Sequence, residues 1–364
     1  MASKRKHHFV PRFYLRGFAS APKRIHLYNF DNDILRADIS LNKQCQKNHF
    51  YGSDNVVENA LAEIEGNIAP VIASIRENHE LPDLRSEGHH LLILFVAFQL
   101  VRTTGTADKI NEFIDLVGKK IALYFSDLSN KDLEAVRISL ENPVYISMSC
   151  VDDMAEGIED LKMQLVCCSN EQRFFTSDDP TFRYNTFCED IQEAGKVGVL
   201  CHGLQIFLPI SPTALLILYD ENIYKVGDGR FSVLENITDK DVATLNRLQA
   251  ISANQNMYFS DWSCRDQVEE SYRNAKRLRE KMQVHANEFC GVGGEEETES
   301  SLIHIYDLLP NLELDLSFVD FRRKAVRMSD SDRVNSYRKE MNQTVSDFHS
   351  PHLAEKERVF RRAG

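Results

Sequence analysis

Hydrophobic positions recur at helical spacing in the first third of the chain. Between residues 49 and 77 an apolar side chain follows every three or four residues, which predicts an amphipathic helix. Asn55, with Glu58 three residues later, is typical of a capping box at the start of such a helix. Pro70 predicts a kink or a break inside it.

Other patterns lie on either side of this helix. Residues 86–104 are apolar on every side over most of their length and predict a central buried helix. One or two further helices are expected over 106–141. Upstream, residues 24–37 alternate apolar and polar positions around the turn residues 31–33, which predicts a β-hairpin.

The period of the pattern changes to two after residue 143. Short apolar runs bounded by turn residues predict strands, and short joins between consecutive strands favour antiparallel pairing. The predicted strands cover residues 145–151, 161–168, 173–177, 204–211 and 213–220. Helices return at 238–256, which begins with the capping pair Thr238 and Asp241, and at 265–287.

These elements place the protein in the α+β class. We expect a helical N-terminal part with a β-hairpin, a central antiparallel sheet, and C-terminal helices that pack back on it. Residues 291–301 combine glycine, glutamate and serine, and such a composition predicts a linker. The expected organisation is a main domain over 1–290, this acidic linker, and a small basic extension over 302–364.

Charge and composition narrow the class of protein. The net charge is −12, yet residues 1–24 and 321–364 are basic, so the ends could meet a polyanion or the acidic body. The most apolar run, 91–101, is too short to cross a bilayer, and the basic start lacks the apolar run of a secretory signal. The eight cysteines show no metal-ligand spacing. A cytoplasmic protein with reduced cysteines, not bound to a membrane, is expected.

The stretch KHHFVPRFYLRGF, residues 6–18, is the first candidate site. Pro11 suits the first residue of a short helix, and Gly17 suits its C-terminal end. His7 and His8 would then precede the helix N-terminus, where the helix dipole disfavours a charged imidazole. A neutral histidine there could act as a base or as a metal ligand.

Arg12 falls in the first turn of this short helix. A positive charge is unfavourable at that end unless an anion or an acidic side chain lies beside it. The stretch therefore predicts an anion site. The alternative is a basic surface arm whose arginines are solvated and whose aromatic residues belong to the core.

Glu58 and Glu65 lie on one face of the predicted helix 49–77. Paired carboxylates at this spacing can bind a metal ion or support acid–base chemistry. The alternatives are a capping role for Glu58 and a solvated surface position for Glu65.

Gln99 and Arg102 are neighbours at the end of the apolar helix 86–104. A buried arginine requires a carboxylate or a ligand anion as its partner. A structural ion pair and a role in ligand binding are equally compatible with this position. The candidate partners of Arg102 are Glu58, Glu65, Asp178 and Asp179.

Two later polar pairs complete the candidates. Asp178 and Asp179 precede a proline at the end of a predicted strand, where they could form a simple turn or contribute to a metal or ligand site. Asn246 and Gln249 share one face of helix 238–256, and amides in such places usually bond to a neighbouring loop.

Several motifs are absent from the sequence. It has no G-x-x-x-x-G-K-[ST] loop, no strand-linked G-x-G-x-x-G, no G-x-S-x-G elbow and no H-E-x-x-H. A nucleoside triphosphatase, a Rossmann oxidoreductase and a serine hydrolase are therefore poorly supported. The HHFVP stretch is similar to the start of an HNH endonuclease motif, but the later Asn and His are too distant.

Taken in order, these stretches resemble a bacterial and phage family, domain of unknown function 4238 (DUF4238). The match rests on an opening H-x-V-P-x-x-Y-L-x-x-F, on Q-x-x-R-T, on T-S-D-x-P and on L-N-x-x-Q. These motifs place His8, Tyr14, Arg102, Asp178 and Gln249 at family positions, over residues 1–262. The resemblance implies no established activity, and it suggests a setting in anti-phage defence.

The leading hypothesis is a hydrolase acting on a phosphate-bearing substrate, nuclease-like, with nucleic acid or a nucleotide as partner and Mg²⁺ as a possible cofactor. The rival is a non-catalytic binding module whose polar residues form an internal hydrogen-bond network. A toxin-like effector is a third option. The sequence does not predict an oligomeric state. The candidate roles are catalysis for His8, Glu58, Arg102 and Asp178, substrate binding for His7, Arg12, Tyr14, Gln99, Asn246 and Gln249, and metal binding for Glu65 and Asp179.

Overall fold

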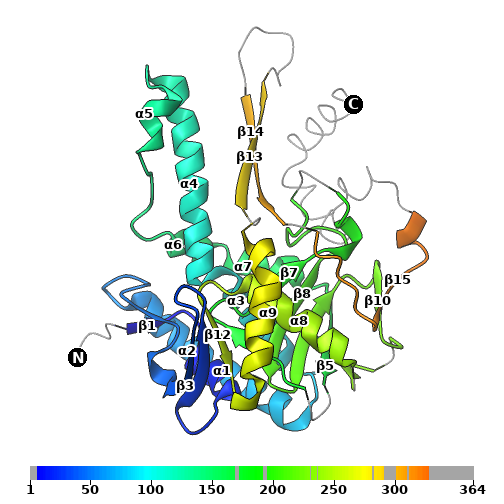
Figure 1. The fold of residues 1–364 in the computed structure, drawn as a ribbon. Helices are drawn as coiled ribbons and strands as arrows, with labels where there is room; N and C mark the ends of the chain where they lie inside the picture. The colour runs from blue at the N-terminus through cyan, green and yellow to red at the C-terminus, as the bar shows by residue number, and fades with distance from the viewer. Residues whose placement is uncertain are drawn as a thin grey trace.

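The fold was analysed in a computed structural model of the 364-residue chain (Figure 1). The structure describes residues 6–168, 172–191, 195–229, 231–235, 237–280, 283–290, 301–309 and 311–327. For residues 283, 285–290 and 301–308 it describes the backbone alone. Of the basic extension expected over 302–364, residues 328–364 lie outside the described residues, as do residues 291–300 of the expected linker.

The N-terminal part begins with a small two-stranded sheet. Strand β1 (Lys6–His8) pairs antiparallel with β4 (Gln46–Asn48). Helix α1 (Arg12–Leu15) and the 3-10 turn η1 (Arg16–Phe18) follow β1. The expected hairpin over 24–37 is confirmed by strands β2 (Arg24–Asn29) and β3 (Ile34–Ser40), which pair antiparallel.

Helices dominate the next hundred residues. They are α2 (Val56–Asn78), α3 (Glu87–Val101), α4 (Thr104–Phe125), α5 (Asn130–Glu134), α6 (Val144–Ser149) and α7 (Val151–Ile158). Pro70 lies inside α2, which remains one helix of 23 residues. Helix α3 is central, as its composition predicts, because nine of its fifteen residues are buried.

The strand expected over 145–151 is wrong, because this stretch forms α6 and the start of α7. Pro143 caps α6, and Val144 and Ser147, three residues apart, are its buried positions. The alternation of apolar and polar residues there is compatible with the two-residue period of a strand and with the 3.6-residue period of a helix. Packing of α6 and α7 against α3 selects the helix.

The central sheet has five strands in the order β11-β5-β9-β8-β7. Its members are β5 (Lys162–Cys167), β7 (Phe182–Tyr184), β8 (Gln205–Ser211), β9 (Ala214–Tyr219) and β11 (Val233–Leu234). The expected antiparallel pairing is confirmed for β5, β9, β8 and β7, whereas β11 runs parallel to β5.

A second, antiparallel sheet joins the N-terminal hairpin to two strands from much later in the chain. Its order is β3-β2-β12-β6, with β12 (Asn256–Phe259) between the N-terminal hairpin and β6 (Thr176–Ser177). The strand expected over 173–177 is thus reduced to its last two residues. This short strand brings the turn that follows it next to the C-terminal helices.

The C-terminal helices are α8 (Asp239–Ser252) and α9 (Arg265–Arg279). The expected capping box is confirmed, since the Thr238 hydroxyl accepts from the Asp241 N–H at 3.2 Å while Asp241 Oδ2 accepts from the Thr238 N–H at 3.0 Å. Helix α9 ends at Arg279, earlier than predicted, and residues 283–290 form a strand instead.

Residues on both sides of the expected linker pair with each other. Strand β13 (Gln283–Cys290) forms an antiparallel pair with β14 (Ser301–Leu308). Beyond it, β15 (Val319–Phe321) pairs with β10 (Tyr224–Val226), and Leu312, Leu314 and Phe318 are buried in the core. Residues 311–327 therefore pack on the main body.

The core lies on both faces of the five-stranded sheet. Along β9, Leu216 and Leu218 belong to a cluster shared with α2 and α3, whereas Leu215 and Ile217 belong to a cluster shared with α8 and α9. The sheet is thus covered by helices on each side, with α8 and α9 in front in Figure 1. Such double coverage explains the continuous apolar runs of β8 and β9.

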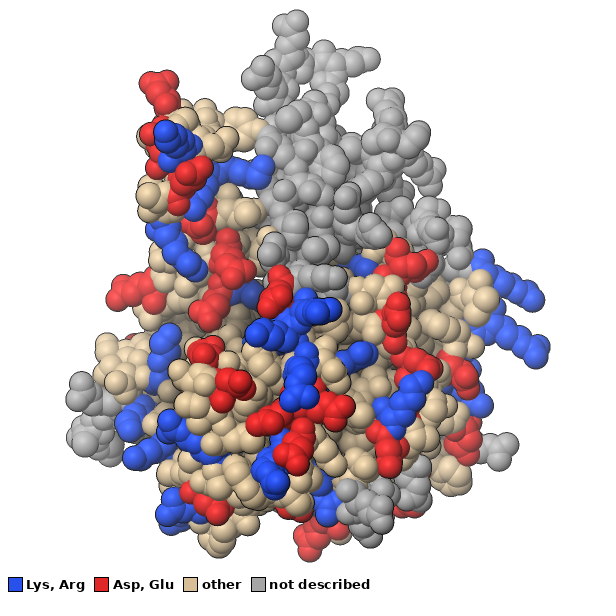
Figure 2. Space-filling model, viewed as in Figure 1, with Lys and Arg blue, Asp and Glu red and all other residues tan. Residues whose placement is uncertain are grey.

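The lengths of the apolar helices, the surface charge and the state of the cysteines bear on function. Within the described residues no single helix is long and apolar enough to span a membrane, although α3 and α4, which meet at a 51° bend, would pass together by length and composition. On the face drawn in Figure 2, acidic and basic side chains are interspersed. The seven cysteines described with their side chains are free thiols.

Candidate functional site

The two opening histidines lie in strand β1, not beside a helix N-terminus. Helix α1 begins at Arg12 with Pro11 as its N-cap, and it is only four residues long. Because β1 pairs with β4, the side chains of His7 and His8 point to opposite faces of the strand. His7 is fully buried and His8 is partly exposed. The helix dipole therefore does not act on these imidazoles as expected, and their surroundings are set by the pairing of β1 with β4.

His7 is held on both ring nitrogens. Its Nδ1 accepts from the Tyr51 backbone N–H at 3.1 Å, so its Nε2–H donates to Asn55 Oδ1 at 3.1 Å. The imidazole also stacks on the Tyr51 ring with centroids 5.8 Å apart. These contacts assign His7 a structural position rather than the substrate-binding one suggested by the sequence.

The expected capping box at the start of α2 is absent. Asn55 is the N-cap but adopts a left-handed conformation, with φ of 59°, and its side chain makes no capping hydrogen bond. Its amide oxygen is engaged by His7 instead, and the Val56 N–H donates to Asp54 at 3.1 Å.

A cavity of about 490 Å³ lies between β1, α1 and α2. One face of α2 contributes to it, through Glu58, Leu61, Ala62, Glu65 and Gly66, which follow helical spacing. The charged and titratable side chains that line the cavity are Lys6, His8, Arg12, Arg16, Glu58 and Glu65. The structure thus brings together four candidate residues. His8 and Arg12 come from the opening stretch, and Glu58 and Glu65 come from α2.

His8 is positioned as a neutral imidazole with one defined donor. Its Nε2 lies 3.3 Å from the Asn42 carbonyl oxygen, an acceptor that requires the proton on Nε2 and leaves Nδ1 as an acceptor. Burial lowers the pKa of His8, and the charges of Arg12 and Arg102 lower it further. The Asn42 hydrogen bond and Glu65 act in the opposite direction without reversing this shift.

Arg12 lines this cavity and carries an unsatisfied donor. Its Nε is buried and has no hydrogen-bond partner. A guanidinium N–H without a partner is costly when it is shielded from water, so the position favours an acceptor that is brought by a ligand. An oxyanion is the acceptor that matches the charge and the fork of an arginine.

Arg102 lies behind the cavity and holds Glu65. The Arg102 Nη1 and Glu65 Oε1 are 2.9 Å apart, and the Arg102 side chain is 1% exposed. With its amide oxygen turned toward Arg102, Gln99 accepts from Nε and Nη2 at 3.1 Å each. Of the four carboxylates considered from the sequence, Glu65 is therefore the partner. Arg102 and Gln99 orient a wall of the cavity and do not line it.

Asp178 belongs to a different part of the molecule. Its Oδ1 accepts from the Asn254 N–H at 2.8 Å, and its Oδ2 accepts from the backbone N–H groups of Gln255 at 2.9 Å and Asn256 at 3.1 Å. The Asn256 side chain donates as well, at 3.2 Å. The structure does not bring Asp178 to His8, and this carboxylate anchors the loop between α8 and β12. Burial raises its pKa to about 6, although these four donors oppose the rise.

The remaining polar candidates hold the segment around β6. Asn246 accepts from the Phe175 N–H at 3.0 Å, and Gln249 donates to Ser177 Oγ at 2.6 Å. From the other side, the Tyr14 hydroxyl donates to the Pro209 carbonyl at 2.6 Å and lies 2.7 Å from Thr176 Oγ1. The predicted face of amides is confirmed as a contact with a neighbouring loop. Tyr14, Asn246, Gln249 and Asp178 form a set that we call the clamp residues.

Asp179 lines a second cavity, of about 510 Å³, between α4, β7 and the end of α8. Its Oδ2 lies so close to Gly105, in the first turn of α4, that a Cβ on this glycine would be 2.7 Å away. Burial raises the pKa of Asp179 to about 7, and the nearby charge of Asp178 adds to the rise against the effects of Lys109 and Thr103.

This raised pKa predicts a pH dependence of stability. Between the ordinary pKa near 3.8 and about 7, the folded chain binds more protons at Asp179 than the unfolded chain does, so the free energy of unfolding falls as the pH rises. Asp179→Asn removes this dependence and stabilises the protein at pH 7.5 by about 1–2 kcal/mol, because the partly exposed carboxylate keeps some hydration. Urea unfolding from pH 4.5 to 7.5 measures both effects, and an unchanged slope would contradict them.

The suggested metal role of Glu65 and Asp179 has no shared site. The two residues line different cavities, and Glu65 is already paired with Arg102. Among the residues whose side chains are described, no three His, Cys, Asp or Glu groups could hold a metal ion together. The positively charged side chains that line the cavity with His8 also disfavour the binding of a metal cation there. The donor set of this cavity fits an anion better than Mg²⁺.

Sequence reasoning missed Lys6 and Arg16 as cavity residues. Lys6 is two residues from His8 on one strand, and Arg16 is four residues from Arg12, so both share a face with a candidate. The spacing of Lys6 from His8 and of Arg16 from Arg12 is the signal in the sequence that could have identified both as cavity residues. Asn42, which sets the tautomer of His8, lies in the 3-10 turn η2 (Leu41–Lys43) and has no such signal.

Gly17 has a role other than ending α1. It lies inside η1, and a Cβ on it would be 2.3 Å from Arg76 Cζ. Arg76, from the last turn of α2, donates to the carbonyl groups of Phe13 and Tyr14 at 3.0 and 2.7 Å. The missing side chain at Gly17 therefore lets α2 hold the cavity-forming segment through its arginine.

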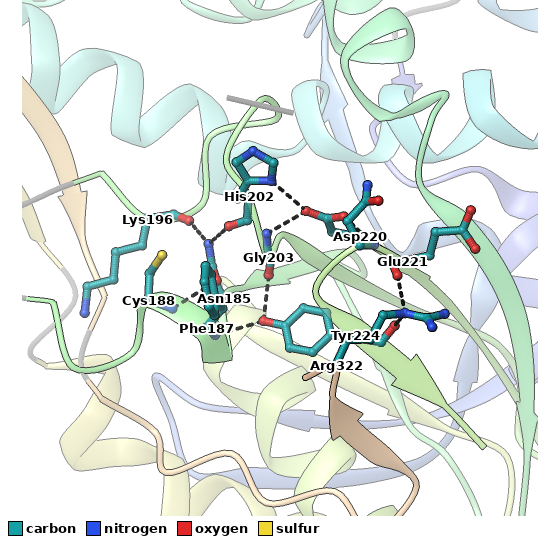
Figure 3. A network of polar contacts seen from close by, with 11 residues as sticks. Asn185, Phe187, Cys188, Lys196, His202, Gly203, Asp220, Glu221, Tyr224 and Arg322 are labelled. Atoms are coloured by element: carbon teal, nitrogen blue, oxygen red, sulfur yellow. Dashed lines mark hydrogen bonds and ion pairs between the residues drawn. The ribbon is translucent and has the colours of Figure 1, made fainter. Parts of the chain in front are cut away.

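A separate network, also unforeseen, organises residues 185–191 and 195–204 (Figure 3). Asp220 Oδ2 is 3.2 Å from His202 Nδ1 and accepts from the Gly203 N–H at 3.0 Å. Burial opposes ionisation of Asp220, but these hydrogen bonds and one from Asn222 hold its pKa below the ordinary value. The Tyr224 hydroxyl donates to the Gly203 carbonyl at 2.9 Å. None of these side chains lines the cavity around His8.

Comparison with known families gives a match over most of the described chain. A family model described as "Protein of unknown function (DUF4238)" matches residues 6–263. This range contains the cavity around His8, all the clamp residues and the five-stranded sheet. No significant match was found among curated proteins or among solved structures.

Proposed function

Because the chain belongs to the DUF4238 family, whose description states no activity, we propose a function from the cavity itself: it binds a phosphate-bearing substrate and hydrolyses it. Nucleic acid or a nucleotide is the proposed substrate class. The observation that carries the proposal is the buried, unpartnered Nε of Arg12 in a cavity that also contains a neutral histidine.

The charges around the cavity support an anionic ligand. Lys6, Arg12 and Arg16 line it, against the carboxylates of Glu58 and Glu65. The charge of Glu65 is offset by Arg102 at 2.9 Å, which leaves a local excess of positive charge. An arginine presents Nε and one terminal nitrogen as a pair, and two oxygens of a phosphate fit this pair. Arg12 is therefore assigned to hold the phosphate.

His8 supplies the acid–base chemistry in this proposal. Its Nε2–H is committed to Asn42, so Nδ1 is the atom that accepts a proton. Water attacks phosphorus, its proton passes to Nδ1, the ester P–O bond breaks, and the leaving oxygen takes a proton from solvent. The lowered pKa of His8 keeps this base unprotonated at neutral pH. The cations then neutralise the charge that develops on the phosphoryl oxygens.

The test uses purified full-length chain, bis(p-nitrophenyl) phosphate and a single-stranded oligonucleotide as substrates. His8→Gln is expected to lower kcat by about 10²–10⁴-fold. Arg12→Gln is expected to raise KM about tenfold or more and to weaken binding of inorganic phosphate. The acid limb of the kcat/KM profile is expected below pH 6.5 in the wild type, in line with the lowered pKa of His8, and absent in His8→Gln.

Two matched variants control for general effects of losing a charge or a ring. His90→Gln changes a histidine whose side chain is 54% exposed, and Arg36→Gln changes an exposed arginine of β3. Both are expected to keep wild-type kinetics. Full activity of His8→Gln, or no hydrolysis of either substrate by the wild type, would overturn the proposed hydrolase.

The clamp residues favour a second candidate function, a non-catalytic binding module. Asp178 accepts four hydrogen bonds, and Asn246 bonds the backbone of both Phe175 and Arg173. Such saturated groups stabilise a scaffold and are not available to a substrate. In this case the wild type binds inorganic phosphate and Arg12→Gln does not, while no phosphate ester is hydrolysed. The same two assays therefore distinguish the candidates.

A further inference from the structure

The cavity of about 510 Å³ between α4, β7 and the end of α8 has no part in the proposed hydrolysis. The described residues that line it differ from those that line the cavity around His8. Its volume falls within the roughly 300–1,000 Å³ of small-molecule sites. Much of its wall is apolar, and Phe113 of α4 and Phe182 of β7 each contribute an aromatic ring. Aromatic walls of this kind suit a flat ligand.

Thr181 lines this cavity and carries an unsatisfied polar group. The residue is 6% exposed, and its Oγ1 is buried without a hydrogen-bond partner among the described residues. A buried hydroxyl that makes no hydrogen bond is costly. The position therefore favours a hydrogen-bonding group that is brought by a ligand.

Asp179 lines the same cavity two residues before Thr181. Its backbone is fixed on α8, because the Ser252 hydroxyl donates to the Asp179 carbonyl at 2.7 Å and the Gln249 side chain donates to it at 3.1 Å. Burial raises the pKa of the Asp179 carboxyl to about 7, so its protonated form is well populated at neutral pH. A protonated carboxyl presents an O–H donor beside a C=O acceptor.

The complement of a protonated carboxyl is an amide whose N–H and C=O lie side by side. Each partner then donates one hydrogen bond and accepts one, so neither leaves an unsatisfied group in the cavity. We propose that this cavity binds a small, flat, neutral ligand with such a cyclic amide edge, as several nucleobases have, at Asp179 and Thr181. Proteins read a nucleobase in this way, by hydrogen bonds to its edge and by contacts of apolar side chains with its faces.

Charged side chains face Asp179 from several elements. Lys109 of α4 and Arg183 of β7 lower its pKa, whereas the adjacent Asp178 raises it. Arg279 of α9 interacts with it electrostatically as well, but donates to the carbonyl groups at the end of α8. Charges of both signs therefore surround the carboxyl, and burial remains the main influence on it. An uncharged ligand meets this wall without the cost of desolvating an ion.

Isothermal titration calorimetry of the full-length chain tests the ligand class. Uridine and 2-pyridone, which both carry a cyclic N–H beside a C=O, are the probes. We expect binding of at least one of them, and 3-methyluridine, whose N–H is blocked, is expected to bind at least tenfold more weakly than uridine. Binding of 2-pyridone alone supports a small lactam as the source of the amide edge, and binding of uridine supports a nucleoside. The proposal is overturned if neither probe binds at about 1 mM, or if uridine binds no better than 3-methyluridine.

Substitutions at Asp179 distinguish a neutral ligand from a cation. Asp179→Asn keeps a donor beside an acceptor, so it is expected to bind the probe about as tightly as the wild type. Asp179→Ala, which removes both groups, is expected to bind it at least tenfold more weakly. Glu112→Gln, at an exposed carboxylate of the same cavity, is the matched control and should leave the affinity unchanged. If Asp179→Asn loses as much affinity as Asp179→Ala, the site requires a negative charge and the proposal is wrong.

Substitutions at Thr181 separate ligand binding from stability. Thr181→Val exchanges the hydroxyl for a methyl group of the same shape, and it is expected to weaken binding of the probe about tenfold. The free energy of unfolding in urea should not fall, because the hydroxyl has no partner to lose in the free protein. Thr181→Ser, which restores a hydroxyl, is expected to recover most of the affinity. Unchanged affinity in Thr181→Val would exclude the assigned contact.

The affinity of the wild type for the probe is expected to fall as the pH rises from about 6.5 to 8. The protonated carboxyl of Asp179 is the form that binds, so binding takes up a proton, and each pH unit well above 7 costs about tenfold in affinity. Asp178, whose pKa is raised to about 6, is mostly ionised over this range. The affinity of Asp179→Asn is expected to stay constant. An affinity of the wild type that rises with pH would overturn the proposal, because the ionised carboxylate would then be the form that binds.

Discussion

Replacing Arg102 by methionine is expected to lower the free energy of unfolding by about 3–5 kcal/mol. Arg102 is 1% exposed, and the change leaves Glu65 without its partner at 2.9 Å and Gln99 without two donors. A buried charge that loses its partner is costly, whereas removal of both charges is much less so. Chemical denaturation followed by circular dichroism measures the effect.

The double variant Arg102→Met/Glu65→Leu provides the control. It removes the unpaired carboxylate, so it is expected to regain a substantial part of the stability that the single variant loses. The difference between the double variant and the sum of the two single variants gives the coupling energy of the pair. A loss below about 1 kcal/mol in Arg102→Met would show that solvent already satisfies Glu65, and would contradict a structural ion pair.

Asp178→Asn is expected to destabilise the protein by about 2–4 kcal/mol. The carboxylate accepts from three consecutive backbone N–H groups, those of Asn254, Gln255 and Asn256, on both of its oxygens. An amide has one acceptor oxygen, and its NH₂ would face an N–H donor in a buried place. The free energy of unfolding is measured in urea at pH 7.5, where the carboxylate is ionised.

Asp179→Asn is the matched control for this experiment. It is the same isosteric change at the adjacent residue. Burial raises the pKa of both carboxyls, but four hydrogen bonds oppose the rise at Asp178 and one, from Thr103, opposes it at Asp179, so the opposite sign is expected for Asp179→Asn at this pH. If Asp178→Asn were as stable as the wild type, the loop after α8 would be held by other contacts. Asp178 would then be a candidate for chemistry after all.

The helices and strands that the sequence predicted well are those with a strong period and clear ends. The α3 pattern, the β8 and β9 runs and the Thr238 capping box are confirmed because each depends on neighbours a few residues away, and α2 is confirmed as a helix although it begins at Val56 rather than at residue 49. The stretch over 145–151 failed because its pattern fits two periods. Its contacts with α3, fifty residues earlier in the chain, decide between them.

The candidate polar residues were found by type but not by role. The sequence singled out Arg102 as a buried arginine and named its four possible partners. It could not select Glu65, because 37 residues and a turn between helices separate the pair. Likewise Asn55 was assigned to a capping box, a local interaction, and its side chain instead bonds His7 across 48 residues. Long-range partners compete with local ones, and the sequence shows only the local ones.

The sequence by itself determined the α+β class, the order of most elements and the membership of the family. It also singled out Arg102, Asp178 and Gln249 by residue type, because buried polar groups stand out against apolar patterns. Only the tertiary structure decided that these residues form two separate sets, the cavity around His8 and the clamp around Asp178. The physical reason is that two strand pairings, β1 with β4 and β6 with β12, fix which side chains face one another. Neither contact leaves a periodic trace along the chain.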